Sequence, residues 1–207
     1  MNKLHTFDEA VRFHGHECPG LAIGYRVAAT AIELLAVERP QDEELVAVVE
    51  NDTCAVDAVQ VVTGCTFGKG NLVFKDYGKG GFSFFSRNKN KAFRITYRGF
   101  PTLPGADGAR MEELKKRIRV ENSATDNERK EFGTLRQKLI KHILTVPPEE
   151  LLKWQELTEE PPAPARIHQS IVCENCGEQV MDTRIRRLKG RSLCIPCAEA
   201  AAKKART

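Results

Sequence analysis

The spacing of apolar positions predicts helices in the first part of the chain. Thr6 and Glu9 form the pattern of a capping box, which predicts a short helix over 7–14. Apolar or small residues then recur every three or four positions, which predicts a second helix over 19–37 with a proline in its first turn. Gly24 lies within this helix and would let another backbone come close.

Runs of β-branched and aromatic residues predict strands further along. The run LVAVVE at 45–50 is typical of a buried strand. Apolar residues return to helical spacing over 54–62, and three strand-like runs follow at 72–77, 82–87 and 92–98. The links between these strands are rich in glycine, lysine and asparagine, as turns are.

The pattern changes again in the second half of the chain. Charged, periodic segments predict two helices, over 111–120 and 126–144. The segment PPEELLKWQEL at 147–157 predicts a third helix, because a pair of prolines precedes residues that favour helices. These long charged helices are larger than is required to cover one face of a small sheet. We therefore expect part of their surface to contact a second copy of the chain in a homodimer.

The segment PPAPAR at 161–166 has the composition of a semi-rigid linker. It predicts three parts: an α+β core domain (1–160), the proline-rich linker (161–168) and a small C-terminal domain (169–207).

Charge is distributed unevenly between these parts. The net charge is +4, and the residues from Arg166 onward hold nine Lys/Arg against four Asp/Glu, which leaves 1–165 near −1. Apolar residues make up 41% of the chain, enough for a core, but no run approaches the roughly 18 apolar residues of a membrane span. The first residues lack the apolar run of a signal peptide, so we expect a cytoplasmic protein without a membrane partner.

Four of the seven cysteines predict a zinc site. Two C-x2-C pairs, separated by seventeen residues, supply four thiolates for one Zn²⁺: Cys173, Cys176, Cys194 and Cys197. A knuckle, a basic hairpin (TRIRRLKGRS) and a final helix indicate a treble-clef zinc finger whose folding the metal drives. The basic hairpin lacks aromatic residues for stacking on bases, so nucleic acid is not the favoured partner, and protein contact or structural capping are alternatives.

The stretch FHGHECPG predicts a second site. Cys18 and Cys54 each stand at the start of a helix, where the helix dipole favours a thiolate. His16 lies two positions before Cys18, so His16, Cys18 and Cys54 are candidate ligands of an open catalytic metal site that would hold zinc or another divalent ion. A redox thiol pair is an alternative, and buried structural cysteines are another. His14 is expected to close the first helix rather than to face this site.

Two further residues extend the candidate site. Asp57 follows Cys54 closely and is a candidate acid–base or orienting group, so the catalytic candidates are Cys18, Cys54 and Asp57. Cys65 lies in a glycine-rich loop and is a candidate fourth ligand or resolving thiol.

Two blocks resemble a known family. FHGHECPGLAIGYR (13–26) and ENDTCAVDAVQVVTGCTFGKGNL (50–72) are similar to the two characteristic blocks of the FmdE family of formylmethanofuran dehydrogenase subunits, some members of which carry a C-terminal zinc finger. The resemblance implies a mixed sheet of about five strands flanked by helices, loosely thioredoxin-like. It also implies a zinc-binding active site at His16, Cys18 and Cys54, with these neighbours: Asp57, Gln60 and Cys65.

The resemblance implies a setting as well. Formylmethanofuran dehydrogenase is a molybdenum or tungsten oxidoreductase of methanogenesis, which suggests an accessory subunit, or a relative of one, in anaerobic one-carbon or redox metabolism. Association with formylmethanofuran dehydrogenase-type subunits is then expected, and an activity of the chain itself would depend on metal or thiol. Two alternatives stay open: a zinc-finger protein that contacts nucleic acid or a protein while the core senses metal or redox state, and a metal-handling protein.

Overall fold

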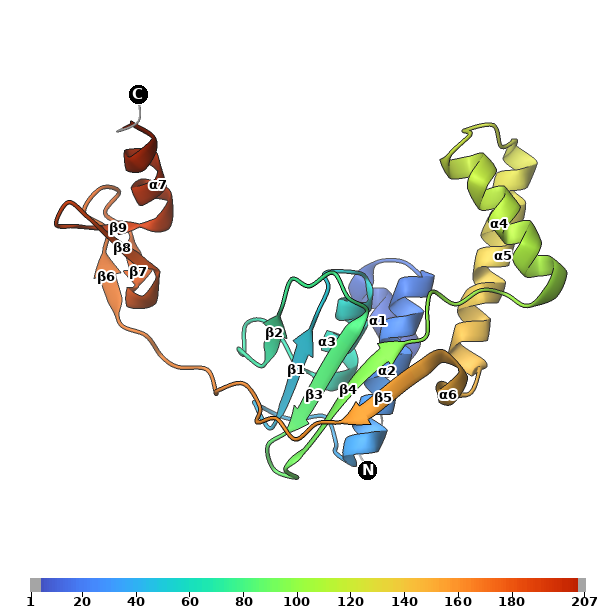
Figure 1. Ribbon diagram of the computed structural model, residues 1–207, viewed down its shortest axis with the longest axis horizontal. Coiled ribbons are helices and arrows are strands. Elements are labelled where there is room, and N and C mark those ends of the chain that lie inside the picture. Colours follow the sequence, from blue (N-terminus) through green and yellow to red (C-terminus); the bar gives the residue numbers. More distant parts are fainter. Residues whose placement is uncertain (1–4, 205–207) are drawn as a thin grey trace. The chain divides into compact units, whose positions relative to one another are not determined.

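The computed structural model describes residues 5–204, which form two compact units. The first unit extends to Pro164 and the second begins at Ala165 (Figure 1). Among these described residues, no helix is both long enough and apolar enough to cross a membrane.

The first unit is built on a mixed sheet of five strands, in the order β2-β1-β3-β4-β5. Only β1 and β2 pair in parallel, and the other pairs are antiparallel. The sequence had implied such a mixed α+β sheet, and this prediction is confirmed. The strands are β1 (Leu45–Val49), β2 (Leu72–Phe74), β3 (Gly81–Ser86), β4 (Lys91–Tyr97) and β5 (Leu152–Glu156).

The two central strands are buried along their whole length. In β3, Phe82 and Phe84 pack into the main core beneath the helices, whereas Phe85 points to the opposite face and packs against Val46 and Val48 of β1. Because successive side chains of a strand point to opposite faces, β3 contributes to the apolar clusters on both sides of the sheet.

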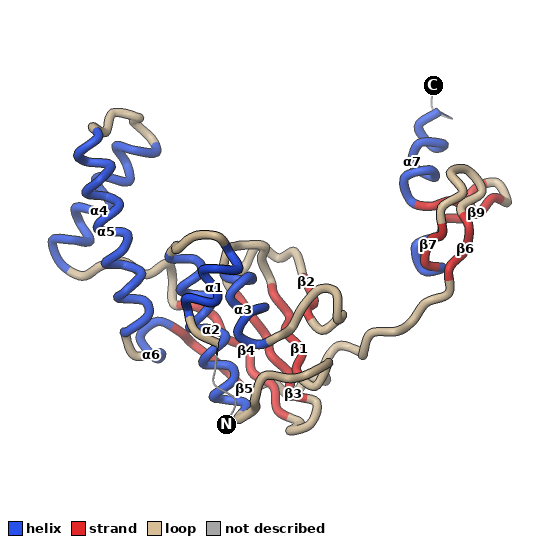
Figure 2. The backbone as a smooth tube through the Cα atoms, turned by 180° about the vertical axis from the view of Figure 1, so that it is seen from behind, coloured by secondary structure: helices blue, strands red, loops and turns tan. Residues whose placement is uncertain are grey.

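Three helices cover one face of the sheet: α1 (Phe7–His14), α2 (Pro19–Leu35) and α3 (Ala55–Thr63) (Figures 1 and 2). The capping box at Thr6 starts α1 as predicted. Gly24 of α2 lies directly against α3, since a Cβ added there would stand 2.2 Å from the carbonyl oxygen of Ala55. The predicted close approach of a second backbone is therefore confirmed, and it holds the starts of α2 and α3 together.

A helical hairpin extends from the sheet (Figure 1). It consists of α4 (Gly105–Arg119) and α5 (Asp126–Thr145), and ion pairs such as Lys138–Asp107, at 2.7 Å, join the two helices. The later part of α5 packs against α2, where the guanidinium of Arg26 donates to the carbonyl of Ile143 at 2.9 Å.

Three predicted elements differ from the structure. The expected helix over 147–157 is wrong, because only a short α6 (Pro148–Leu151) forms before the chain becomes β5. Strand β5 pairs with β4 and buries Leu152, so pairing with a distant strand outweighs local helix propensity. Helix α4 begins six residues before the predicted start, and the strand expected over 72–77 ends at Phe74.

The second unit holds two small hairpins and a helix. Its elements are β6 (Ser170–Val172), β7 (Gln179–Met181), the 3₁₀ turn η1 (Asp182–Arg184), β8 (Ile185–Leu188), β9 (Arg191–Cys194) and α7 (Ile195–Lys204). Leu193 is its one fully buried large side chain among the described residues, so this unit has little core of its own.

Candidate metal centres

The ends of three helices converge on one cluster in the first unit. His14 is the last residue of α1, and Cys18 is the N-cap of α2. One ligand atom from each of His14, His16 and Cys18 lies within 4.8 Å of the others. Gly15 is the C-cap of α1 and has a left-handed φ of 94°. This conformation ends the helix and reverses the chain, which brings Cys18 close to His14.

His14 is held in a fixed orientation. Its Nδ1 lies 2.7 Å from Oδ2 of Asp57, and Gln60 donates to the other carboxylate oxygen at 3.4 Å. With Nδ1 donating to Asp57, the neutral ring presents an unprotonated Nε2, which lies 3.9 Å from the sulfur of Cys18. The sequence had suggested that His14 lies outside the site, whereas the structure brings it into the cluster.

The sulfur of Cys18 is buried and faces the first turn of α2. The backbone N–H of Leu21 donates to it at 3.3 Å, which holds the sulfur at this helix start. A tetrahedral ion bound to one sulfur and one imidazole nitrogen holds them about 3.6 Å apart. The separation of 3.9 Å between Cys18 and His14 is therefore close to that of a metal site. His16 is exposed, and the centroid of its ring lies 4.5 Å from that of the His14 ring, with the two rings tilted by 37°.

Cys54 lies beside this cluster at the N-cap of α3. A Cβ added to Gly20 would lie 3.9 Å from the sulfurs of both Cys18 and Cys54, so the two thiols flank the same glycine. Burial, followed by the neighbouring Cys18, raises the pKa of Cys54. The predicted lowering of this pKa by the helix start is thus wrong for Cys54, because desolvation and a second thiol outweigh the dipole.

The structure does not bring Cys65 to the cluster. Cys65 follows the far end of α3, is fully buried in the main core and donates to the carbonyl of Leu45 at 3.3 Å. Burial raises the pKa of its thiol to about 11. Cys65 therefore behaves as a small core residue rather than as the fourth ligand that its glycine-rich surroundings suggested.

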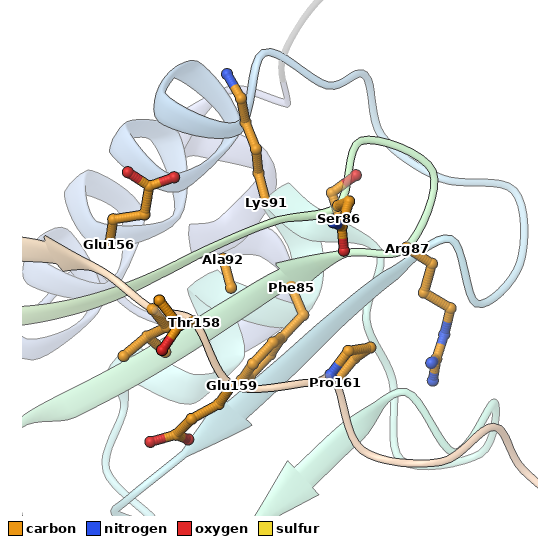
Figure 3. A pocket seen from close by; sticks show the side chains of 11 residues that line it. Phe85, Ser86, Arg87, Lys91, Ala92, Glu156, Thr158, Glu159 and Pro161 are labelled. Carbon is orange, nitrogen blue, oxygen red and sulfur yellow. The ribbon is translucent and has the colours of Figure 1, made fainter.

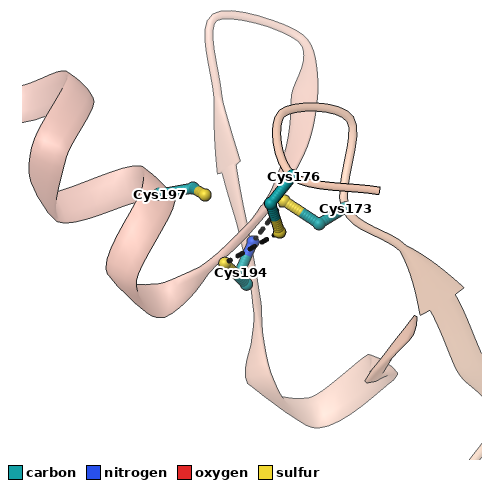
Figure 4. A group of neighbouring side chains, drawn as sticks. All are labelled: Cys173, Cys176, Cys194 and Cys197. Carbon is teal, nitrogen blue, oxygen red and sulfur yellow. Dashed lines mark hydrogen bonds between the residues drawn. The ribbon is translucent and has the colours of Figure 1, made fainter. Parts of the chain in front are cut away.

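The second unit holds a cluster of four cysteines: Cys173, Cys176, Cys194 and Cys197 (Figure 4). The sulfurs of Cys176 and Cys194 lie 3.9 Å apart. Four sulfurs around one Zn²⁺ at about 2.3 Å stand about 3.8 Å from each other, so this separation fits a tetrahedral zinc site. Backbone N–H groups of Cys176, Cys194 and Asn175 lower the pKa of Cys173 to about 6, as suits a thiolate ligand.

A cavity of about 320 Å³ adjoins the first cluster, with Cys18 and Pro19 in its wall. Another cavity, of about 400 Å³, lies at the opposite end of the sheet, where β3 ends and β4 begins (Figure 3). Its lining mixes Glu156 and Glu159 with Arg87, and no cysteine or histidine of the described chain contributes. Only the first of these cavities is therefore placed to serve the cluster.

Comparisons with known proteins agree with this architecture. A family model described as "FmdE, Molybdenum formylmethanofuran dehydrogenase operon" matches residues 13–153. A model described as "Prokaryotic dksA/traR C4-type zinc finger" matches residues 168–201. The second match bears out the predicted C-terminal zinc finger.

Two individual proteins are similar to this chain. A probable S-adenosyl-L-methionine-binding protein of Archaeoglobus fulgidus is 32% identical over 193 residues, which are 91% of this chain and 51% of that protein. The chain thus spans about half the length of this curated relative. A crystal structure of a tungsten formylmethanofuran dehydrogenase FmdE-like protein from Syntrophus aciditrophicus aligns with a TM-score of 0.54 at 22% identity, over 95% of this chain and 94% of that one. This likeness shows a shared fold.

Proposed function

The chain belongs to the FmdE family and carries a C4-type zinc finger, and we propose that its core domain is a metal-dependent accessory protein of anaerobic one-carbon or redox metabolism. The proposed metal, Zn²⁺ or another divalent ion, is bound by His14, His16 and Cys18, with Cys54 beside it. This differs from the set expected from the sequence, in which Cys54 stood in the place of His14.

The observation that carries the proposal is the hydrogen bond between Asp57 and His14. A carboxylate on one ring nitrogen of a histidine, with a thiol near the other, is the usual surrounding of a metal-binding imidazole. The donor set of two imidazoles and one thiolate suits zinc and similar divalent ions.

The residues of the chain have distinct roles in this proposal. Asp57 fixes the tautomer of His14, and the N–H of Leu21 holds the sulfur of Cys18 in place. Three protein ligands leave one coordination position for substrate or water, and a bound divalent ion would supply Lewis-acid chemistry there. Cys54 is a neighbouring thiol that either completes the ligand set or contacts the bound substrate.

The family description supports the cellular role and the partners. We propose that the protein is an accessory subunit, or a relative of one, of molybdenum or tungsten formylmethanofuran dehydrogenase, and that it associates with subunits of that type. We also propose a homodimer, because the helical hairpin of α4 and α5 extends from the sheet (Figure 1). Light scattering during size-exclusion chromatography tests this, since a monomer mass at all concentrations would contradict it.

S-adenosyl-L-methionine, named for the archaeal relative, is not part of this proposal. The chain spans only half of that relative. The cavity beside Cys18 also has an excess of cationic residues, which is unfavourable for the positively charged sulfonium of that molecule.

Metal content per chain tests the proposal. Wild-type protein should hold two metal ions per chain, one in the core and one in the finger. Cys18→Ser should lose one ion and Cys176→Ser the other, while the double variant holds none. One ion in both wild type and Cys18→Ser would refute the core metal site and leave the alternative of a redox thiol pair.

The finger supports a second candidate function, contact with nucleic acid. The turn η1 and the β8–β9 hairpin expose several basic side chains: Arg184, Arg186, Arg187, Lys189 and Arg191. Clustered cations of this kind bind phosphates with a steep dependence on salt. Fluorescence anisotropy with labelled RNA and DNA at low salt tests this function, and Lys203→Gln on α7 is the control for Arg186→Gln. Unchanged anisotropy at low salt would exclude it.

A further inference from the structure

The cavity beside Cys18 lies between three parts of the first unit. The start of α2 forms one wall, the loop 100–103 forms a second, and the facing sides of α4 and α5 form the rest. Its volume of about 320 Å³ is within the range of small-molecule sites. Gly108 of α4 allows the loop to pack this closely, because a Cβ there would stand 2.0 Å from the carbonyl oxygen of Leu103.

Large apolar side chains line most of this cavity: Phe100, Leu103, Met111, Phe132 and Leu139. Phe100 is 61% exposed and Met111 and Phe132 are partly exposed, so their surfaces remain available to a ligand. Removing this apolar surface from water is favourable, so the cavity favours a ligand with an apolar body.

Cationic side chains give the cavity a charge. Lys115 is paired with Glu112 at 3.2 Å. Arg119 and Arg136 also line the cavity, and neither side chain forms an ion pair or hydrogen bond with another described residue. Three cations and one carboxylate therefore leave an excess of two positive charges, held by two guanidinium groups that are free to bind an anion.

The cationic residue Arg119 and the thiol of Cys18 lie in different parts of the cavity wall. Met111, Lys115 and Arg119 follow one another at intervals of four along α4, so they share one side of the helix over a rise of about 12 Å. Cys18 lies in the wall that α2 contributes, whereas Arg119 is the last residue of α4. A ligand of this length would bring one end to Arg119 and the other toward the metal cluster.

We propose that this cavity binds an organic carboxylate with an apolar body and is the substrate site of the protein. The carboxylate contacts Arg119 and Arg136, the apolar body lies against Met111 and Phe132, and the opposite end of the molecule reaches Cys18. This proposal rests on the proposed metal site only for the reaction at the end of the ligand that reaches Cys18. Binding itself follows from the cavity and its charge.

Methionine methyl groups give a site-specific test. The described residues contain two methionines, Met111 in the cavity wall and Met181 in the finger, so a protein labelled with ¹³C at the methionine methyls carries its own control. Titration with 4-phenylbutyrate should shift the Met111 resonance to saturation and leave Met181 unchanged. A probe of about 12 non-hydrogen atoms is expected to bind with a Kd of about 1 mM.

Matched ligands and variants identify the carboxylate contact. Losing a charge-assisted hydrogen bond should weaken binding about tenfold, so 4-phenylbutyramide, Arg119→Gln and Arg136→Gln should each raise the Kd by that factor. Arg129→Gln is the control, because Arg129 is exposed on the same helix as Arg136 and does not line the cavity. Circular dichroism should show that all three variants remain folded.

Three results would overturn the proposal. The first is no shift of Met111 with the carboxylate, and the second is equal binding of the carboxylate and its amide. The third is a Met111 resonance that responds to protein dilution instead of to ligand, which would assign the cavity to a second copy of the chain. Metal content of the same samples separates the two proposals: binding without core metal refutes only the metal site, and core metal without binding refutes only the cavity.

Discussion

Replacing Gly24 by alanine should disrupt the core metal site without unfolding the protein. Gly24 lies against Ala55, the first residue of α3, and both helices begin at a cysteine of the candidate site. The substitution should therefore displace the metal site, although Gly24 itself contributes no ligand.

The size of the effect follows from the distances. The new Cβ would lie 2.2 Å from the carbonyl oxygen of Ala55, and ordinary van der Waals contact begins at 3.4 Å, so the backbone of α3 must retreat by the difference, 3.4 − 2.2 = 1.2 Å. Cys54 directly precedes Ala55 and moves with it. Asp57, which holds the ring of His14, also lies on α3 and moves with it. Metal–ligand distances tolerate only about 0.2 Å, so a shift of this size should displace His14 from the ligand set.

The cost in stability should be moderate. Overpacking costs about 1–3 kcal/mol, and replacing a helical glycine by alanine returns up to about 1 kcal/mol, so the net loss should be about 1–2 kcal/mol. Gly133→Ala is the matched control, because Gly133 lies in α5 and a Cβ there meets nothing within 4 Å. That variant should be slightly stabilised.

Metal analysis and thermal unfolding of the two variants check this reasoning. Gly24→Ala should lose the core metal, keep the finger zinc and melt earlier, whereas Gly133→Ala should keep both ions. If Gly24→Ala keeps its core metal and its melting temperature, the close contact between the helices does not position the site.

Three further predictions concern other parts of the chain. Arg94 contacts both carboxylate oxygens of Glu50 at 2.8 Å and lowers the pKa of that buried carboxyl, so Glu50→Gln should cost about 1.5–3 kcal/mol at pH 7. Because the folded pKa lies below the unfolded value of about 4.3, the stabilisation is lost as pH falls through the folded pKa, and the gap in melting temperature should close in acid and persist at pH 7. Cys65→Ala should keep both metals at a cost of about 1 kcal/mol, and loss of a metal ion on elemental analysis would contradict its place in the core. Cys173→Ser should unfold the finger on circular dichroism while the melting transition of the first unit stays unchanged; a shift of that transition would show that the units depend on each other.

Local signals in the sequence were sufficient for the first helices. The capping box at Thr6 and the proline at the start of α2 set the beginnings of both helices, because these interactions involve residues only a few positions apart. The role of Gly24 was also readable, since a glycine on the apolar side of a helix indicates close packing. The four finger cysteines followed from their spacing alone.

Features that depend on distant contacts were not predictable in this way. Strand β5 looked helical because its propensity favours a helix, and only its pairing with β4 makes it a strand. His14 could not be placed, because its partner Asp57 lies 43 residues away on another helix. Cys65 resembled a ligand by its neighbours in sequence, but the fold carries it to the other end of α3 and into the core.

The ligand shell of the core metal distinguishes binding by His14, His16 and Cys18 from the alternatives. X-ray absorption spectroscopy of Cys173→Ser/Cys176→Ser protein observes the core metal without the finger zinc. We expect a mixed shell, in which nitrogen atoms of His14 and His16 lie about 2.05 Å from the metal and the sulfur of Cys18 lies about 2.3 Å from it. A shell of sulfur alone, or a variant that binds no metal, would contradict it.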